Sequence, residues 1–168
     1  MEKQDLARWL CHYKLSKYRE DIEPHRGREG EFYRLFKPYE VIEGQGNCLL
    51  NTGIDEMWDL ITGVSSNYYN NANAQIGVGD SSTAADPSQT DLQAATNKTY
   101  KGMESGYPTS TSQKISLKSS FGSSEANYAW NEWVVKQGTS AICLNRKVDS
   151  LGTKTSGTWT LEVTITLS

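Results

Sequence analysis

The side chains that could perform chemistry are few and scattered along the 168 residues. Both histidines, His12 and His25, lie before residue 46, so the rest of the chain has no imidazole to activate a serine or cysteine nucleophile. A glycosidase needs only two carboxylates, and Glu104 with Glu125 or Glu132 would supply them, yet no motif selects such a pair. We therefore predict no catalytic site and a protein that is not an enzyme.

Two ligand-binding patterns begin in the stretch GVGDSSTAADPSQTD, residues 77–91, and neither is complete. The stretch lacks the Gly-Lys-Ser/Thr ending with which a phosphate loop holds phosphate and magnesium. Its three aspartates miss the spacing and the closing glutamate of a calcium-binding EF-hand loop. The three cysteines are far apart and show no CxxC spacing. We expect a polar loop with a turn at Asp86-Pro87, and no cofactor, metal site or disulfide framework.

Overall charge and hydropathy exclude two classes of partner. The net charge is -3 and no basic cluster occurs, which argues against nucleic acid. No apolar run approaches the roughly 20 residues of a membrane span. Residues 1–15 are too charged for a secretory signal. We expect a soluble protein made in a cytoplasm.

The chemical character of the chain changes at about Gly46. Residues 1–46 hold nine of the seventeen Lys and Arg residues and seven of the seventeen aromatic residues, but no Thr or Asn. The later residues are poor in charge and rich in Ser, Thr and Asn. This contrast predicts an N-terminal arm over residues 1–46 and a body domain over residues 47–168.

The arm is expected to combine a helix with an extended segment. Apolar and aromatic residues approximate a helical stripe over residues 4–21, and Pro38 interrupts a second apolar stretch over residues 31–42. So many aromatic side chains need a partner, which is either the body itself or a neighbouring subunit or protein. The candidate partner-binding residues are Trp9, Tyr13, Phe32, Phe36 and Tyr39. If the arm docks elsewhere, deleting residues 1–46 should leave a folded body.

The body begins with one helix and continues with strands. Apolar residues at helical spacing predict a helix over residues 48–62, with Asp55 and Glu56 in its first turn and Gly63 as its C-terminal cap. Strict alternation over residues 158–167 predicts a strand with one buried and one solvated face. Further strands are expected over residues 74–78, 114–118, 128–135 and 141–148. The fold class is therefore mainly β with some α: an antiparallel sandwich or barrel-like sheet with one packed helix.

Several stretches of the body resemble small virion proteins of tailed bacteriophages. They are LLNTGIDEMWDLITG (49–63), AQIGVGDSSTAADPSQTDLQ (74–93), YAWNEWVV (128–135) and LNRKVDSLGTKTSGTWTLEVTITLS (144–168). The resemblance is closest to capsid decoration, or cement, proteins and does not extend into residues 1–46. It implies a structural protein on the capsid surface that binds the major capsid protein, and a homo-oligomer such as a trimer would suit local three-fold sites.

A tail or fibre module that binds host-surface glycan is the alternative interpretation. It is suggested by the polar loops and by three tyrosines, Tyr68, Tyr69 and Tyr107.

Overall fold

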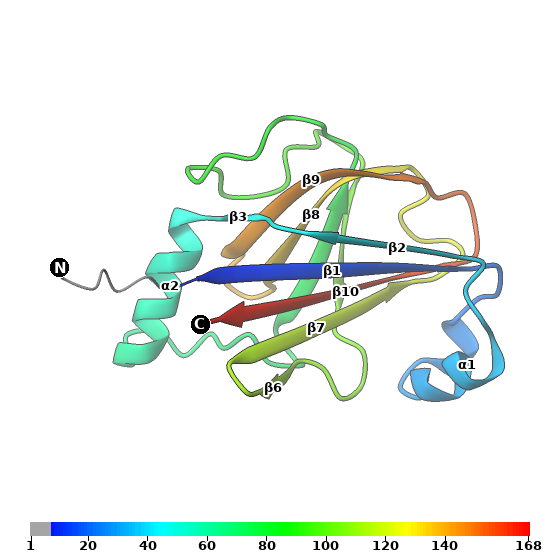
Figure 1. Cartoon of the computed structure of the whole chain (residues 1–168), viewed down its shortest axis with the longest axis horizontal. Coiled ribbons are helices and arrows are strands. Elements are labelled where there is room, and N and C mark those ends of the chain that lie inside the picture. The colour runs from blue at the N-terminus through cyan, green and yellow to red at the C-terminus, as the bar shows by residue number, and fades with distance from the viewer. Residues whose placement is uncertain (1–7) are drawn as a thin grey trace, which may run out of the picture.

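Two antiparallel five-stranded sheets form the molecule, and the computed structural model describes residues 8–168 (Figure 1). Sheet A has the strand order β2-β1-β10-β7-β6, and sheet B has the order β3-β9-β8-β4-β5. The strands of sheet A are β1 (Trp9–Tyr18), β2 (Glu40–Gln45), β6 (Thr109–Thr111), β7 (Lys114–Phe121) and β10 (Thr158–Leu167). Those of sheet B are β3 (Cys48–Leu49), β4 (Ala74–Gly79), β5 (Lys98–Gly102), β8 (Ala129–Gln137) and β9 (Cys143–Thr153). The predicted β-sandwich is confirmed.

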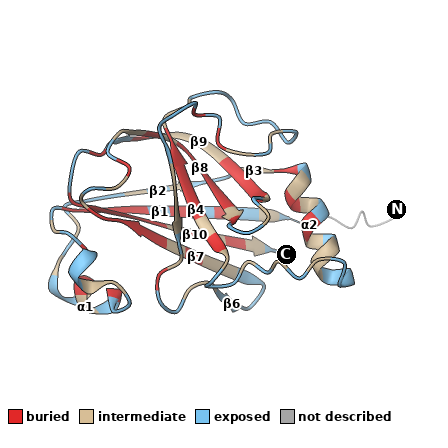
Figure 2. Ribbon diagram, turned by 180° about the vertical axis from the view of Figure 1, so that it is seen from behind, coloured by how far each residue is buried: buried red, intermediate tan, exposed pale blue. Residues whose placement is uncertain are grey.

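The core lies between the sheets and follows from the period-two patterns. In β10, Trp159, Leu161, Val163 and Ile165 are buried, and the residues between them face outward. Sheet B contributes Trp130, Trp133 and other apolar side chains to the same cluster. Figure 2 shows that burial is concentrated in the strands of both sheets, whereas the helices are largely exposed or intermediate.

The helix expected over residues 4–21 is wrong for the described part of that range, because Trp9–Tyr18 forms β1. Cys11, Tyr13 and Leu15 alternate with exposed residues and point into the core. β1 lies between β2 and β10, and it pairs with β10 over ten residues, from Trp9 opposite Leu167 onward. The composition boundary at Gly46 is therefore not a boundary of the fold, since β1 and β2 complete sheet A.

Between β1 and β2 the chain leaves the sheet as an insert of residues 19–39. The insert holds a short 3-10 helix (Glu23–His25) and helix α1 (Glu29–Leu35). The extended segment expected over residues 31–42 is therefore wrong for residues 31–35, which are helical, and residues 40–42 belong to β2. Ile22 and Phe32 are fully buried and form a small cluster with Tyr18 of β1. Arg26 Nη1 donates to Ser120 Oγ of β7 at 2.9 Å. The insert thus packs on the body of its own chain.

Helix α2 (Asn51–Thr62) confirms the helix predicted over residues 48–62. Gly63 caps it with the left-handed backbone, φ 75°, that glycine adopts easily. The expected acidic first turn is wrong, because the helix begins at Asn51 and no acidic residue lies in its first turn. Gly53 lies so close to β9 that an added Cβ would approach the Leu144 carbonyl oxygen to 2.4 Å.

Neither helix of residues 8–168 has the length and apolar character that crossing a membrane requires.

Candidate functional site

Two of the five predicted partner-binding residues are inside the molecule. Tyr13 is 3% exposed and packs edge-on against Trp133, with ring centroids 5.6 Å apart. Its hydroxyl donates to Asp149, and burial together with that carboxylate raises the pKa of the tyrosine. Phe32 is fully buried in the insert. Neither side chain is available to a partner.

The other three predicted residues lie at two different ends of the sandwich. Trp9 is partly buried at the end that carries α2, and its Nε1 donates to Asn47 Oδ1 at 2.9 Å. Phe36 packs on Phe32 within the insert. Tyr39 is half exposed at the C-terminal end of the insert, with the Arg19 guanidinium 5.0 Å from its ring centroid. The structure does not bring the five aromatic residues together into one site.

The three candidate catalytic carboxylates are engaged in contacts that hold the fold together. The pairs are Glu104 with Tyr33 and Lys118, Glu125 with Lys101 and Arg26, and Glu132 with Arg146. Burial raises the pKa of Glu125, but hydrogen bonds from Lys101 and from the Gly122 amide outweigh it and leave the pKa below its usual value. None of the three carboxylates lines any of the hollows described below.

The aspartates of residues 77–91 likewise serve the loop that contains them. The Asp86 carboxylate accepts from the Ser88 amide at 2.8 Å, which is the expected turn chemistry at Asp86-Pro87. Asp80 accepts from Asn97 Nδ2 at 2.7 Å. Within residues 8–168, no three His, Cys, Asp or Glu side chains gather in a way that could hold a metal ion.

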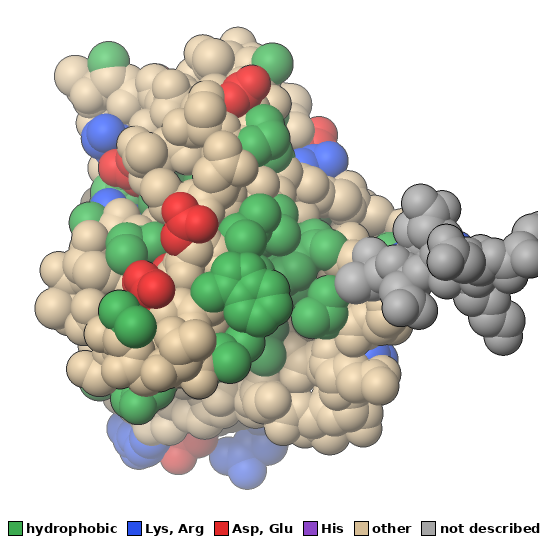
Figure 3. Space-filling model, turned by 90° about the vertical axis from the view of Figure 1, so that its left-hand side faces the viewer, with side chains coloured by type: hydrophobic (Ala, Val, Ile, Leu, Met, Phe, Trp, Pro, Cys, Tyr) green, Lys and Arg blue, Asp and Glu red, His purple; other side chains and the backbone are tan. Residues whose placement is uncertain are grey.

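A broad apolar surface covers the end of the sandwich where α2 lies (Figure 3). We call it the apolar end. It combines exposed side chains with an apolar depression of about 200 Å³. The exposed members are Trp58, Ile61, Val64 and Leu167. The depression is lined mainly by Trp9, Met57, Tyr69, Ile115, Leu144 and Ile165.

The exposure of α2 is unusual. Its apolar residues have the spacing of a helix face that normally packs against a protein core. Ile54, Met57, Trp58 and Ile61 follow the i, i+3, i+4, i+7 pattern of one helix face. Yet the side chains of Trp58 and Ile61 are 61% and 73% exposed, and the only buried residues of the helix are Gly53 and Glu56. The helix therefore turns Gly53 and Glu56 toward the body, keeps Ile54 and Met57 partly buried, and leaves Trp58 and Ile61 of its apolar stripe uncovered.

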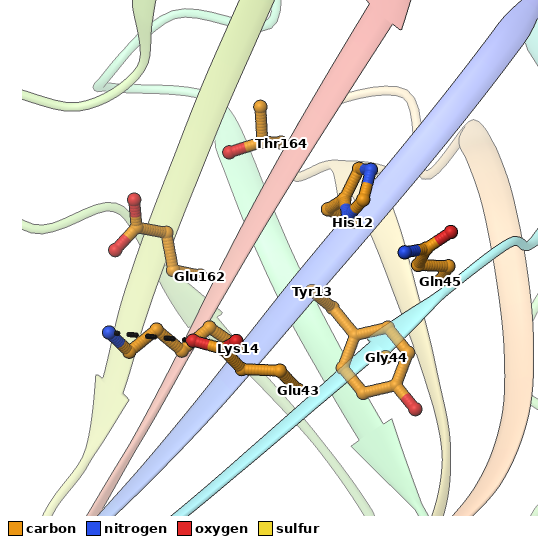
Figure 4. A pocket seen from close by; sticks show the side chains of 8 residues that line it. All are labelled: His12, Tyr13, Lys14, Glu43, Gly44, Gln45, Glu162 and Thr164. Atoms are coloured by element: carbon orange, nitrogen blue, oxygen red, sulfur yellow. Dashed lines mark ion pairs between the residues drawn. The ribbon is translucent and has the colours of Figure 1, made fainter.

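A second, chemically different surface lies on the outward side of sheet A. Here a hollow of about 360 Å³ is lined by side chains from β1, β2 and β10 (Figure 4). We call this outward side the polar face. Its charged members in the hollow are Lys14, Glu43 and Glu162, and Lys14 Nζ lies 3.7 Å from Glu43 Oε1. The arrangement offers hydrogen-bond donors and acceptors of both charge signs.

Comparison with known proteins gives no relative for this chain. No family model, curated protein or solved structure matches it. The resemblance to phage virion proteins therefore stays a prediction.

Sequence reasoning missed both surfaces. The amphipathic pattern of α2 was visible, but which side the body covers depends on the close contact of Gly53 with β9. The polar face depends on strand register, and its one sequence signal was the alternation in residues 158–167. Of the three tyrosines proposed for glycan, Tyr68 is exposed, Tyr69 donates to the Ile142 carbonyl oxygen at 3.3 Å, and Tyr107 lies beside the polar face.

Proposed function

We propose that this protein is a non-enzymatic structural protein that docks through its apolar end on another protein of a larger assembly. The observation that carries the proposal is the exposure of Trp58 and Ile61 on the apolar stripe of α2, beside the apolar depression. Large exposed apolar patches are uncommon on soluble monomers and mark interaction sites when polar residues surround them. Trp58 supplies the kind of aromatic anchor that dominates binding energy at protein interfaces.

The acidic residues of α2 indicate which chemical groups the partner surface should carry. Helix α2 contains Asp55, Glu56 and Asp59 but no Lys or Arg, and within residues 8–168 neither Asp55 nor Asp59 forms an ion pair. The complementary surface is an apolar groove with basic residues along its rim. Two copies of this chain that packed α2 against α2 would oppose like charges. A homo-oligomer, such as the trimer expected from the resemblance, would have to use other contacts.

The assembly that we propose is the head of a tailed bacteriophage, with the major capsid protein as the partner. Support for this setting comes from the resemblance of residues 49–63 and 144–168, which include α2, β10 and most of β9. A decoration protein requires no chemistry, only a rigid module and a surface that binds capsid subunits. The two-sheet core would supply the rigidity and the apolar end the binding surface.

The test is binding to phage heads assembled without this protein. Purified protein should cosediment with the heads and raise their resistance to heat. The Trp58→Ser and Ile61→Ser variants should bind more weakly, by about 2 kcal/mol or more for a central anchor. Leu35→Ser is the matched control, because Leu35 is 60% exposed but lies on α1, at the other end of the sandwich (Figure 1).

Two outcomes would overturn the proposal. One is failure of the unmodified protein to bind the heads, which would remove the capsid as partner. The other is equal binding by Trp58→Ser, Ile61→Ser and Leu35→Ser, which would move the docking surface away from α2. Both substitutions on α2 replace exposed side chains, so the variants should keep the melting temperature of the parent protein and differ only in binding.

A further inference from the structure

The register of sheet A arranges the polar face in rows that run across four strands. Lys14 lies opposite Glu43 on β2 and opposite Glu162 on β10, and Glu162 in turn lies opposite Lys118 on β7. This row therefore alternates in charge from β2 to β7. Directly opposed side chains in a sheet have Cβ atoms about 5 Å apart, so neighbouring groups in a row can contact one ligand together.

A second row lies two residues further along the strands and is uncharged when its histidine is neutral. His12 lies opposite Gln45 on one side and Thr164 on the other, and Thr164 lies opposite Ser116. Figure 4 shows His12, Gln45 and Thr164 beside the charged row, all around the same hollow. Imidazole, amide and hydroxyl groups together both donate and accept hydrogen bonds.

Much of this hydrogen-bonding capacity is unused by the protein. Within residues 8–168, the side chains of His12, Gln45 and Glu162 make no hydrogen bond or ion pair. Lys14 has only the contact to Glu43, and both side chains of that pair are at least half exposed. An exposed ion pair of this kind contributes little to stability, so its groups remain free to bind a ligand.

The hollow continues along the sheet toward two tyrosines. A second hollow of about 240 Å³ shares Lys14 and Glu162 with the first and extends to Tyr33 of the insert. Lys118 Nζ lies 3.8 Å from the ring centroid of Tyr33 and 5.7 Å from that of Tyr107. Tyr33 is held in place by its hydroxyl, which donates to the buried Glu104. Aromatic rings therefore border one end of the polar rows.

From this geometry we propose that the polar face binds a neutral oligosaccharide along the rows from His12 to Tyr33. Vicinal hydroxyl groups both donate and accept, which matches neighbouring ammonium, carboxylate and amide groups. Lys14 is paired with Glu43 and Lys118 with the buried Glu104, and Glu162 adds one further carboxylate, so the face has no excess of positive charge to select a phosphate or a polyacid. At the Tyr33 end, Lys118 Nζ lies over the tyrosine ring, so a sugar there would meet an ammonium donor beside an aromatic ring.

The site is separate from the surface proposed for docking. It uses the outward side of sheet A, whereas the apolar end uses α2 and the strand ends around it. The Trp58→Ser variant should therefore keep saccharide binding, and a protein that fails to bind phage heads could still bind saccharide. The two proposals can fail independently.

The test is an NMR titration of the full chain with three neutral hexasaccharides, maltohexaose, cellohexaose and mannohexaose, at up to about 10 mM, which covers weak millimolar binding. At least one should cause saturable shifts in the amide resonances of residues 12–16, 43–45 and 160–164. The Lys14→Ala/Glu162→Ala double variant should weaken that binding at least about tenfold. Lys37→Ala/Glu20→Ala is the control, because it makes the same charge changes outside both hollows.

Three results would overturn the proposal. The first is the absence of saturable shifts with every hexasaccharide. The second is shifts that map elsewhere on the protein or that persist unchanged in the Lys14→Ala/Glu162→Ala variant. The third is binding only of an acidic probe, hexagalacturonate, which would show that the face selects charge instead of neutral hydroxyl groups.

Discussion

Lys154 is a charged residue whose burial removes the water that would stabilise its ammonium group. Its side chain is fully buried, and Nζ donates to the Gly122 carbonyl oxygen at 2.7 Å and to Asn127 Oδ1 at 2.9 Å. Loss of water around the ammonium group lowers its pKa from 10.5 to about 8, although Glu125 and Asp21 act in the opposite direction. The two acceptors fix the tip of the side chain but do not neutralise its charge.

The lowered pKa of Lys154 predicts that the stability of the protein depends on pH. Between pH 8 and 10.5 the unfolded chain holds the Lys154 proton more tightly than the folded protein does, so this residue makes the free energy of unfolding rise with pH. Below pH 8 both states are protonated and the contribution is constant. The Lys154→Met variant should lack the rise. Chemical denaturation of both proteins from pH 7 to 10.5 measures the difference, and parallel curves would contradict the assignment.

Comparing the two proteins also separates Lys154 from other groups. Burial raises the pKa of Tyr13, Tyr33 and Tyr100, and these phenols make stability fall as the pH rises past the ordinary tyrosine value of 10. They are present in both proteins, so their effect cancels in the difference. What remains is the titration of the single lysine.

Among the elements, the long connection between β4 and β5 is held on sheet B by one buried ion pair. Arg146 and Glu132 are both fully buried, with Nε and Oε2 2.7 Å apart. Glu132 accepts from the amides of Gln93 and Ala94, at 3.0 and 2.8 Å. Arg146 donates to the Thr83 carbonyl oxygen and to Gln89 Oε1, both at 2.9 Å. The pair thus orders a loop that has no helix or strand of its own.

Removing one member of this pair should strongly lower the free energy of unfolding. Arg146→Met leaves the Glu132 carboxylate buried and unpaired, which typically destabilises by about 3–5 kcal/mol. Hydrogen exchange of residues 80–97 should accelerate in the same variant. The double variant Arg146→Met/Glu132→Leu should lose less than the sum of the single effects, because no uncompensated charge remains. Urea unfolding provides these values.

The Lys101–Glu125 pair is the control for that experiment. Both of its side chains are about a quarter exposed. Water and salt weaken such a pair, and Lys101→Met should therefore cost about 1 kcal/mol or less. Equal losses for Lys101→Met and Arg146→Met would contradict the role assigned to burial.

The helices and strands differ in how well the sequence alone predicts them. β10 was predictable because its alternation is strict and one face is wholly apolar. β1 was not, because the large residues Trp9, Leu10 and Tyr13 also fit helical spacing, and the buried alternation passes through the small Cys11. For α2 the sequence indicated a helix with an apolar face, but it did not indicate that Gly53 and Glu56 would form the covered side.

The candidate sites were less predictable than the elements. The rows of the polar face bring together residues from both ends of the chain, such as His12 with Thr164 and Lys14 with Glu162. Their meeting depends on the pairing of β1 with β10, which period-two patterns do not specify. Aromatic content alone pointed to Tyr13 and Phe32, which pack internally, and did not single out Trp58, which is exposed.

At the scale of the whole molecule, the first 46 residues are part of the sandwich. β1 contributes Tyr13 and Leu15 to the common core and pairs with β2 on one side and β10 on the other. Without β1 and β2, one edge of β10 would be unpaired and its buried row, from Trp159 to Ile165, would lose cover. An unprotected apolar edge of this kind favours aggregation. β1 therefore pairs with the edge of β10 that would otherwise be unpaired, and together with β2 it completes sheet A.

A separable arm could be deleted without unfolding the body, whereas this arrangement predicts that deleting residues 1–46 prevents folding. A chain of residues 47–168 should fail to fold and should lack the cooperative thermal transition of the full protein, measured by circular dichroism. A chain that starts at Arg8 is the control, because it retains every strand described, and it should melt as the full chain does. Adding a peptide of residues 8–46 to the 47–168 fragment should restore structure by supplying β1 and β2. A fragment that melts cooperatively without the peptide would contradict this assignment, and residues 1–46 would then again be free to bind a neighbour.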